Sequence, residues 1–377
     1  ASWLHAGAGA AAAPSRPGPD GREGFLALQA IDLASAALFY ALQALMVDPV
    51  AERIGGIDGA GEGAYVAGRA AAIEGPDPVT GARRVDQLRL DDPTFRTGEQ
   101  ARLLRGAVAV FGLSLERRGL FGAGPLAGTA AWPSAPASAE RLLRLQVANL
   151  TDKVWDDDAG AFVESWSPRA GAAARVDAVA HADAIIALRH AAQDGPTNIQ
   201  ADALLPRATA YLVEALRGPD GDVLSEPGQG TETSLAALTL DAQMAGLEAL
   251  ALEAKAGNNP ARAAAEQLWR RLESVWWDDA VDAWQTTLGD PVYVYGPALA
   301  GRVVDALAAA QGAGVGDTVA ERLAAFHAVW IRDHLRLSET WLTGELEEDD
   351  DHDGDGVPKP GRGLDAAAPV FRREIRP

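Results

Sequence analysis

A run of carboxylates near the C-terminal end of the chain has the residue types and spacing of a cation-binding loop. Aspartates stand at the alternate positions 351, 353 and 355, and Gly356 follows them. Calcium prefers several oxygen ligands from alternate positions of a tightly turning loop, with a glycine where the chain bends most sharply. We therefore expect Asp351, Asp353 and Asp355 to supply carboxylates, and Val357 its backbone carbonyl, to a structural calcium ion.

This motif resembles the first half of the calcium loop of EF-hands, dockerins and thrombospondin repeats. The second half departs from that pattern, because Arg362 stands where the loop has a bidentate glutamate and prolines flank Lys359. A distant group, such as Asp365, Asp349 or Glu348, would have to complete the coordination shell. The alternative interpretation is a solvated acidic run before the end of the chain.

Aromatic and acidic side chains gather in the predicted loops between helices, where seven of the ten tryptophans fall. Flat aromatic rings beside carboxylates suit sugar rings, and paired carboxylates hydrolyse glycosidic bonds. The predicted ligand-binding aromatics are Trp155, Trp166, Trp276, Trp277, Trp284 and Tyr293. The candidate catalytic carboxylates are Asp156, Asp158, Asp222, Glu226, Asp278 and Asp279. Each aspartate also has a structural interpretation, in which it caps its own turn while a tryptophan packs beneath the loop.

Helical periodicity dominates the chain, and strand-like alternation is short and scarce. The predicted helices cover 24–47, 97–113, 138–154, 174–192, 198–217, 232–256, 260–276, 295–311 and 317–337. Short links join three consecutive pairs of these helices, and longer links separate the pairs. Short links make antiparallel helical hairpins, and regularly placed long links bring the loops to one face. The expected fold is therefore all-α, with helical hairpins that form an α/α toroid or an incomplete toroid.

The turn Trp155-Asp156-Asp157-Asp158-Ala159-Gly160-Ala161-Phe162 resembles the W-D-x-x-x-G-x-F turn that follows a helix in six-hairpin α/α-toroid enzymes. That superfamily includes glycosidases and N-acylglucosamine 2-epimerases. A second, related turn begins at Val275-Trp276-Trp277-Asp278-Asp279, which indicates a weak internal repeat. The resemblance implies a carbohydrate-active toroid. The chain departs from the epimerase pattern because no histidine is placed as its acid or base would be.

Three segments are expected from the composition along the chain. An N-terminal low-complexity arm covers 1–23, a helical-hairpin domain covers 24–340, and the acidic calcium-type loop and tail cover 341–377. Within the helical domain, the Gly-, Asp- and Pro-rich segment 48–96 is predicted to be loop with one short helix near 63–73.

Composition excludes several classes of function. The net charge of −20 argues against nucleic acid and anionic membrane surfaces as partners. Cysteine is absent, which excludes disulfides, thiolate nucleophiles and cysteine-ligated zinc. The apolar stretch 25–47 contains Gln29, Asp32 and Gln43, so we interpret it as a buried helix and expect no transmembrane span. The start at Ala1, without a charged leader, is typical of a mature extracytoplasmic protein that is periplasmic, secreted or on the cell surface.

The main functional expectation is an extracytoplasmic, calcium-binding helical protein that presents an acidic, aromatic-rich loop face to a ligand or partner. The first alternative is a carbohydrate-active enzyme, similar to a glycoside hydrolase, that uses the loop carboxylates. The second is a structural subunit of a cell envelope or assembly. A carbohydrate or another envelope protein is the expected partner, and the sequence leaves open whether the protein is an enzyme.

Removal of calcium tests the acidic loop. If the loop holds a structural ion, EDTA lowers the midpoint of thermal unfolding, because the ion binds the folded chain in preference to the unfolded one. Added calcium then restores the midpoint, and the variant Asp353→Asn unfolds at the lower midpoint with or without EDTA. A wild-type midpoint that EDTA leaves unchanged, with no metal copurifying, would assign the loop to a solvated acidic tail.

Overall fold

A computed structural model describes residues 34, 36–76, 83–116, 131–227, 238–289 and 293–328. The chain divides into two compact units, the first ending at Leu216 and the second beginning at Arg217. The predicted arm 1–23 and the acidic loop and tail 341–377 lie outside the described residues. The single helical domain predicted for 24–340 stays a prediction. In the described ranges, no helix combines the length and apolar character that crossing a membrane requires.

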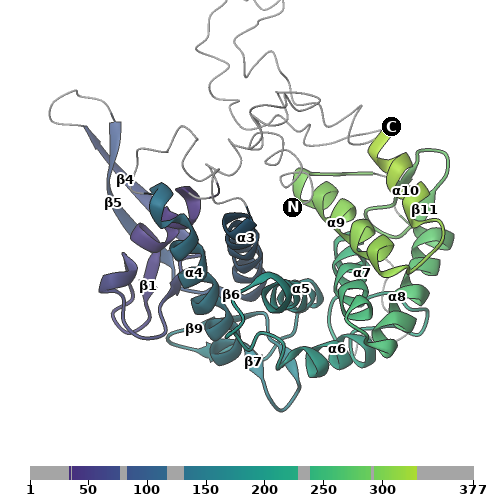
Figure 1. The fold of residues 1–377 in the computed structure, drawn as a ribbon, viewed down its shortest axis with the longest axis horizontal. Coiled ribbons are helices and arrows are strands. Elements are labelled where there is room, and N and C mark those ends of the chain that lie inside the picture. Colours follow the sequence, from purple (N-terminus) through teal and green to yellow (C-terminus); the bar gives the residue numbers. More distant parts are fainter. Residues whose placement is uncertain are drawn as a thin grey trace, which may run out of the picture. The chain divides into compact units, whose positions relative to one another are not determined.

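The first unit contains a short helix over 36–44 and the longer helices α3 to α6, which are labelled in Figure 1. The longer helices are α3 (Thr97–Glu116), α4 (Ala131–Lys153), α5 (Ala178–Asp194) and α6 (Leu205–Glu214). Helix α3 packs against both α4 and α5, and α5 packs against α6. Asp177 precedes helix α5 as its N-cap, and its carboxylate accepts a hydrogen bond from the Ala180 amide at 2.8 Å.

Short antiparallel strands accompany these helices and correct the all-α prediction. One sheet has the order β2-β1-β3, from β1 (Met46–Asp48), β2 (Arg53–Gly55) and β3 (Tyr65–Val66). A separate hairpin pairs β4 (Arg69–Pro76) with β5 (Arg83–Asp92). The helix predicted near 63–73 is therefore wrong. Its alanines favour a helix locally, but pairing with β5 over a long hairpin overrides that preference.

A small sheet leads directly into α3. It has the order β10-β9-β6, from β6 (Phe95–Arg96), β9 (Ser165–Ser167) and β10 (Gly171–Ala172). A two-stranded hairpin, β7 (Trp155–Asp156) with β8 (Ala161–Phe162), follows α4 at once. These short strands carry the chain between the helices and fix where α3 and α5 begin.

The second unit also alternates helices with a short hairpin. Its helices are α7 (Leu240–Lys255), α8 (Asn259–Arg271), α9 (Pro297–Ala313) and α10 (Val319–Phe326). A π-helical turn, η4 (Leu272–Trp276), extends α8 and leads into β11 (Trp277–Asp278) and β12 (Ala283–Trp284). Helix α7 packs against α8 and α9. Within the described ranges, each of these helices lies inside or within a few residues of a predicted one, so the helical interpretation is confirmed there.

A buried histidine connects three elements of the first unit. His181 of α5 is fully buried, and its Nδ1 accepts a hydrogen bond from the Phe162 amide of β8 at 3.1 Å. Because Nδ1 is the acceptor, Nε2 carries the proton and donates to the Ala208 carbonyl of α6, 2.9 Å away. Burial lowers the pKa of His181 to about 4, so the imidazole is neutral in the folded protein.

The neutral imidazole makes stability depend on pH. The pKa of His181 is lower in the folded chain than in the unfolded one, so its contribution is complete above about pH 6.5 and is lost as the pH falls toward 4. The loss between those values is about 1.4 kcal/mol per pH unit. Urea unfolding at pH 7 and at pH 5 measures this loss of unfolding free energy. His181→Gln should have a lower unfolding free energy than the wild type at pH 7. The same variant should lose less of that free energy between pH 7 and pH 5. His190→Gln, at a half-buried position, should keep the wild-type slope; equal slopes in all three proteins would contradict the assignment.

Candidate functional site

A charged pocket opens at the N-terminal ends of α3 and α5, within the first unit. Its volume is about 310 Å³. Four carboxylates, three guanidinium groups and three small or apolar residues line it: Glu99, Glu164, Asp177, Asp183, Arg96, Arg102, Arg175, Gly98, Val179 and Ala180. The positive ends of two helix dipoles point toward it, which favours acceptor groups of a ligand. We call this site the charged pocket.

Backbone hydrogen bonds hold three segments of the chain together around the charged pocket. The amide of Thr97, the first residue of α3, donates to the carbonyl of Glu164 at 3.0 Å. The amide of Glu164 in turn donates to the carbonyl of Arg175 at 2.8 Å. The starts of α3, β9 and α5 are therefore fixed relative to one another, although they lie far apart in the sequence.

The charges of the pocket are largely paired. The Asp183 carboxylate is buried and accepts a hydrogen bond from Arg102 Nε at 3.1 Å. Arg175 Nε lies 3.5 Å from Glu164 Oε2. A hydrogen bond to Asp92 raises the pKa of Arg96, and the fields of Asp92, Glu99 and Glu164 raise it further. The pocket therefore offers ionised donors and acceptors side by side.

Gly98 lies where the N-terminal ends of α3 and α5 approach each other. A Cβ atom at this position would lie 3.5 Å from Asp183 Oδ2 and 3.6 Å from Ala180 Cα. These distances are ordinary van der Waals contacts, so an alanine would fit at this position.

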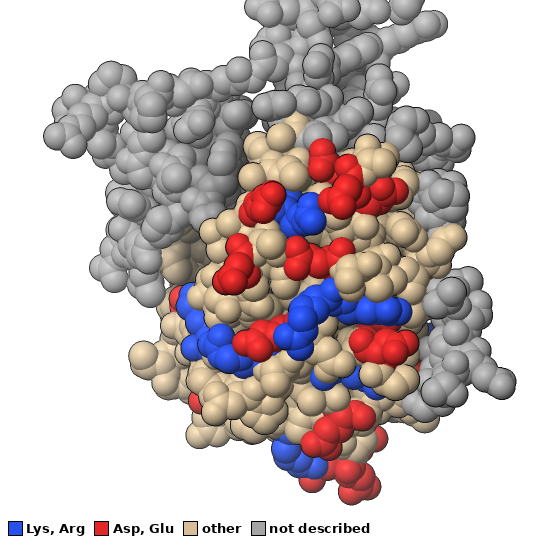
Figure 2. Space-filling view, turned by 90° about the vertical axis from the view of Figure 1, so that its right-hand side faces the viewer, with Lys and Arg blue, Asp and Glu red and all other residues tan. Residues whose placement is uncertain are grey.

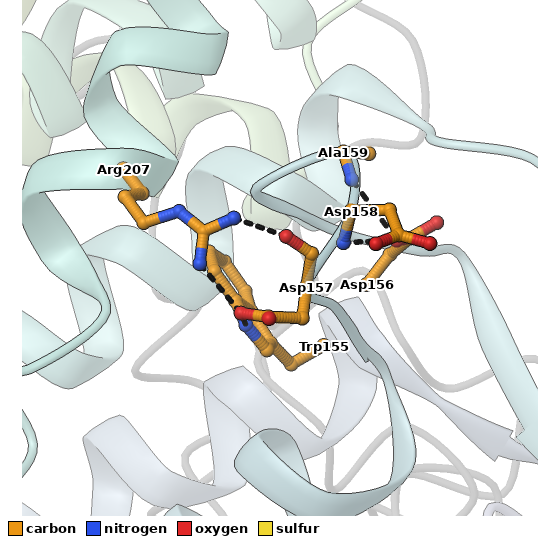
Figure 3. A network of polar contacts seen from close by, with 6 residues as sticks. All are labelled: Trp155, Asp156, Asp157, Asp158, Ala159 and Arg207. Atoms are coloured by element: carbon orange, nitrogen blue, oxygen red, sulfur yellow. Dashed lines mark hydrogen bonds and ion pairs between the residues drawn. The ribbon is translucent and has the colours of Figure 1, made fainter.

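The candidate carboxylates of the first unit lie in the β7–β8 turn, shown in Figure 3. Asp156 Oδ1 accepts hydrogen bonds from the amides of Asp158 and Ala159, both at 3.0 Å, and so supports the turn. Asp158 is exposed. Neither aspartate lines the charged pocket.

Their neighbour Asp157 connects this turn to the next helical hairpin. Its carboxylate accepts from Trp155 Nε1 at 3.2 Å and from the guanidinium of Arg207 in α6. Arg207 also donates to the Asp157 carbonyl, and its guanidinium lies 5.4 Å from the centre of the Trp155 ring. We call this arrangement the Trp–Asp–Arg clamp; Figure 3 shows its three members together.

The second unit repeats the clamp. Asp279 accepts from Trp277 Nε1 at 2.7 Å and from Arg322 of α10 at 3.1 Å. The Arg322 guanidinium lies 4.5 Å from the centre of the Trp277 ring. The two related turns predicted from sequence are therefore related in three dimensions, and their contacts support the structural interpretation of their aspartates.

The remaining candidate carboxylates are Asp278, Asp222 and Glu226. The first two accept hydrogen bonds from neighbouring side chains, and the third is half-buried. Asp278 accepts from the hydroxyl of Tyr293, and that hydrogen bond lowers the pKa of Asp278. Burial, together with the same bond, raises the pKa of Tyr293 to about 12. Asp222 is buried and accepts from Arg271 Nε and Trp276 Nε1, each at 2.9 Å. Glu226 is half-buried.

Most of the predicted ligand-binding aromatics are enclosed. Trp276 and Trp284 are fully buried, and Trp277 and Tyr293 are 8% and 4% exposed. These four rings pack beneath their own loops and offer no open face to a ligand in this structure. Trp155 and Trp166 are only half-buried.

The acidic excess of the chain does not form a uniform patch on the face shown in Figure 2. Acidic and basic side chains are interspersed there. In the second unit the ion pairs include Arg322 with Glu273 at 3.7 Å and Arg302 with Asp241 at 3.1 Å.

Within the described ranges, no group of three or more His, Asp or Glu residues is arranged to hold a metal ion. The predicted calcium ligands Asp351, Asp353, Asp355 and Val357 lie outside those ranges.

Comparison with known proteins finds similarity only among solved structures, since no family model and no curated protein matches the chain. A cellobiose 2-epimerase from Bacillus thermoamylovorans is similar at 12% identity and a TM-score of 0.46, over 65% of this chain and 63% of that one. A sugar epimerase from a ruminal bacterium is similar at 14% identity and a TM-score of 0.49, over 66% and 64%. A D-mannose isomerase is similar at 13% identity and a TM-score of 0.49, over 66% and 62%.

These structures are α/α-toroid proteins, the class that the W-D-x-x-x-G-x-F turn resembles. The chain spans between 62% and 64% of the length of the three. At these identities and TM-scores, the similarity concerns the course of the backbone and not the chemistry of a site.

The structural interpretation of the candidate aspartates is testable by stability. Asp222→Ala leaves the buried Trp276 donor and the half-buried Arg271 guanidinium without their acceptor, so it should reduce the free energy of unfolding by about 1–3 kcal/mol. Asp279→Ala removes a carboxylate that is 82% exposed and should cost less than about 1 kcal/mol. Chemical unfolding of both variants measures the difference. An Asp222→Ala protein as stable as the wild type would contradict a structural role.

Proposed function

We propose that the protein binds a small carbohydrate in the charged pocket and acts on it there. This proposal follows the first alternative from the sequence, a carbohydrate-active enzyme. It differs in the reactive carboxylates, which we assign to the charged pocket and not to the turns between helices. The observation that carries the proposal is the set of four carboxylates and three arginines around a volume of about 310 Å³. The support comes from the chemistry of that lining.

Sugar hydroxyls match this lining because each of them both donates and accepts hydrogen bonds. Carboxylates accept from hydroxyls, and guanidinium groups donate to them in a fixed geometry. The volume lies at the lower end of the range of about 300–1,000 Å³ for small-molecule pockets, which favours a ligand of one or two sugar rings. An apolar ligand is disfavoured, since it would remove ionised groups from water without replacing their hydrogen bonds.

Two carboxylates are the proposed acid and base. Glu99, in the first turn of α3, and Glu164, just before β9, both line the pocket. A carboxylate pair around a bound sugar can supply a general acid and a general base. Asp183 is the proposed positioning residue, because it is buried and holds Arg102 by a hydrogen bond.

Calcium binding by the acidic loop 351–357 is a separate proposal, which rests on the spacing of its aspartates alone. It does not conflict with a carbohydrate site in the first unit. The chelation experiment tests it independently.

Binding and turnover test the proposed function. The wild-type protein is titrated calorimetrically with neutral and acidic monosaccharides and disaccharides, and turnover of any sugar that binds is followed by proton NMR. Glu164→Gln and Glu99→Gln each remove one candidate acid or base and should reduce kcat by about 10²–10⁴-fold. Binding should persist in both variants, because the amide keeps most of the hydrogen bonds.

Two further variants make the result specific. Asp202→Asn neutralises an exposed carboxylate of the same unit outside the pocket and should leave kcat unchanged. Asp158→Asn tests the alternative that the β7–β8 turn is catalytic. The proposal would be overturned if no sugar binds, or if Asp158→Asn abolishes turnover while Glu164→Gln and Glu99→Gln do not.

A further inference from the structure

We propose that the charged pocket selects sugars that carry a free, protonated amino group over neutral and acidic sugars. This inference rests on the proposed function, since it names the class of sugar that the same site takes. The observation behind it is the balance of charge in the lining, where four carboxylates stand against three guanidinium groups. Charge complementarity of this kind contributes more to the choice of ligand than to affinity alone.

Two of the three arginines pair with carboxylates of the pocket itself. Arg102 Nε donates to Asp183 Oδ2 at 3.1 Å, and Arg175 Nε lies 3.5 Å from Glu164 Oε2. The Asp183 side chain is 4% exposed, so its charge acts on Arg102 with little screening by water. An acidic sugar would have to compete with both of these carboxylates for the same guanidinium donors.

The third arginine takes its partner from outside the lining. Arg96 donates to Asp92 Oδ2 at 2.8 Å, and Asp92 is the last residue of β5. This pair therefore brings a fifth carboxylate to the edge of the pocket without a further cation. Among the described residues, Glu99 and Asp177 are the carboxylates of the lining that form no salt bridge.

The helix ends reduce this negative charge but do not cancel it. Helix N-termini attract acceptors, and here the chain supplies them itself: Asp177 caps α5, and Glu99 lies in the first turn of α3. With Asp92 included, five carboxylates face three guanidinium groups, an excess of two negative charges. Each of the two helix ends contributes about half a positive charge, so about one negative charge remains for a ligand to neutralise.

Glu99 and Asp177 border the same space because the starts of α3 and α5 adjoin. A Cβ atom on Gly98, the residue before Glu99, would lie 3.6 Å from Ala180 Cα. The amide of Ala180 is the group that Asp177 caps, through its Oδ1 atom at 2.8 Å. Asp177 is half-buried and Glu99 is exposed, so a ligand in the pocket can reach both carboxylates. We place the ammonium of the sugar between them.

An ammonium group on a sugar matches this arrangement better than a hydroxyl does. It carries three donors and no acceptor, which suits carboxylates that have no donor of their own. A hydrogen bond between two charged groups is about twice as strong as one between neutral groups. Replacement of one hydroxyl by an ammonium should therefore tighten binding about tenfold. Acetylation of the amine removes the charge and should remove that gain.

Four matched sugars test the inference on the full chain. Glucosamine, glucose, N-acetylglucosamine and glucuronic acid are titrated calorimetrically at pH 6, where the amine is protonated. Glucosamine should bind about tenfold more tightly than glucose or N-acetylglucosamine, and glucuronic acid should bind most weakly. The advantage of glucosamine should shrink with added salt, because the Debye length falls from about 10 Å at 0.1 M to about 3 Å at 1 M. Equal binding of glucosamine and glucose, or tighter binding of glucuronic acid, would overturn the inference and leave the sugar site in place; no binding of any sugar would overturn both.

Variants that remove one charge each locate the ammonium. Asp177→Asn keeps the helix cap, because asparagine caps as well as aspartate, and Glu99→Gln keeps the length of its side chain. Each should reduce the affinity for glucosamine severalfold and change the affinity for glucose little, with circular dichroism showing that the fold is kept. Asp202→Asn, which removes an exposed carboxylate outside the pocket, should retain the wild-type preference. A preference for glucosamine that persists when Asp177→Asn and Glu99→Gln are combined, or that Asp202→Asn abolishes, would contradict the assignment.

Discussion

The hydrogen bonds of the buried His181 imidazole are the constraint on which the first unit depends. The imidazole satisfies the Phe162 amide and the Ala208 carbonyl, two polar groups that would otherwise be buried without partners. The hydrogen bond to the Phe162 amide holds β8 in place, and the chain continues from β8 into Val163 and Glu164. Those two residues accept hydrogen bonds from Thr97, and so they fix where α3 begins. The placement of Glu164 in the charged pocket thus follows from a neutral histidine outside it.

The sequence predicted the helices well because their apolar periodicity is a local signal. It missed the β4–β5 hairpin because the alanines of β4 favour a helix until a partner strand is present. It also placed the tryptophans on an open face, whereas Trp276 and Trp284 lie in the core. A tryptophan directly after a helix packs as easily under the following turn as into solvent, and local sequence does not distinguish the two.

The residues of the charged pocket carry no sequence motif. Arg102 and Asp183 are 81 residues apart and meet only because α3 and α5 begin at the same small sheet. One signal was available: predicted helices start close to Thr97 and Asp177, and Arg or Glu stands beside both starts. Charged residues at the N-terminal ends of neighbouring helices point to a common polar site more directly than aspartates in turns, which are needed for the turns themselves.

The Trp–Asp–Arg clamp has a consequence for how the chain is completed during synthesis. Asp157 and Arg207 are 50 residues apart, and Asp279 and Arg322 are 43 apart. Each turn therefore emerges from the ribosome well before the arginine that secures it. Until that arginine arrives, the exposed aspartate and the face of its tryptophan ring lack their common cationic partner.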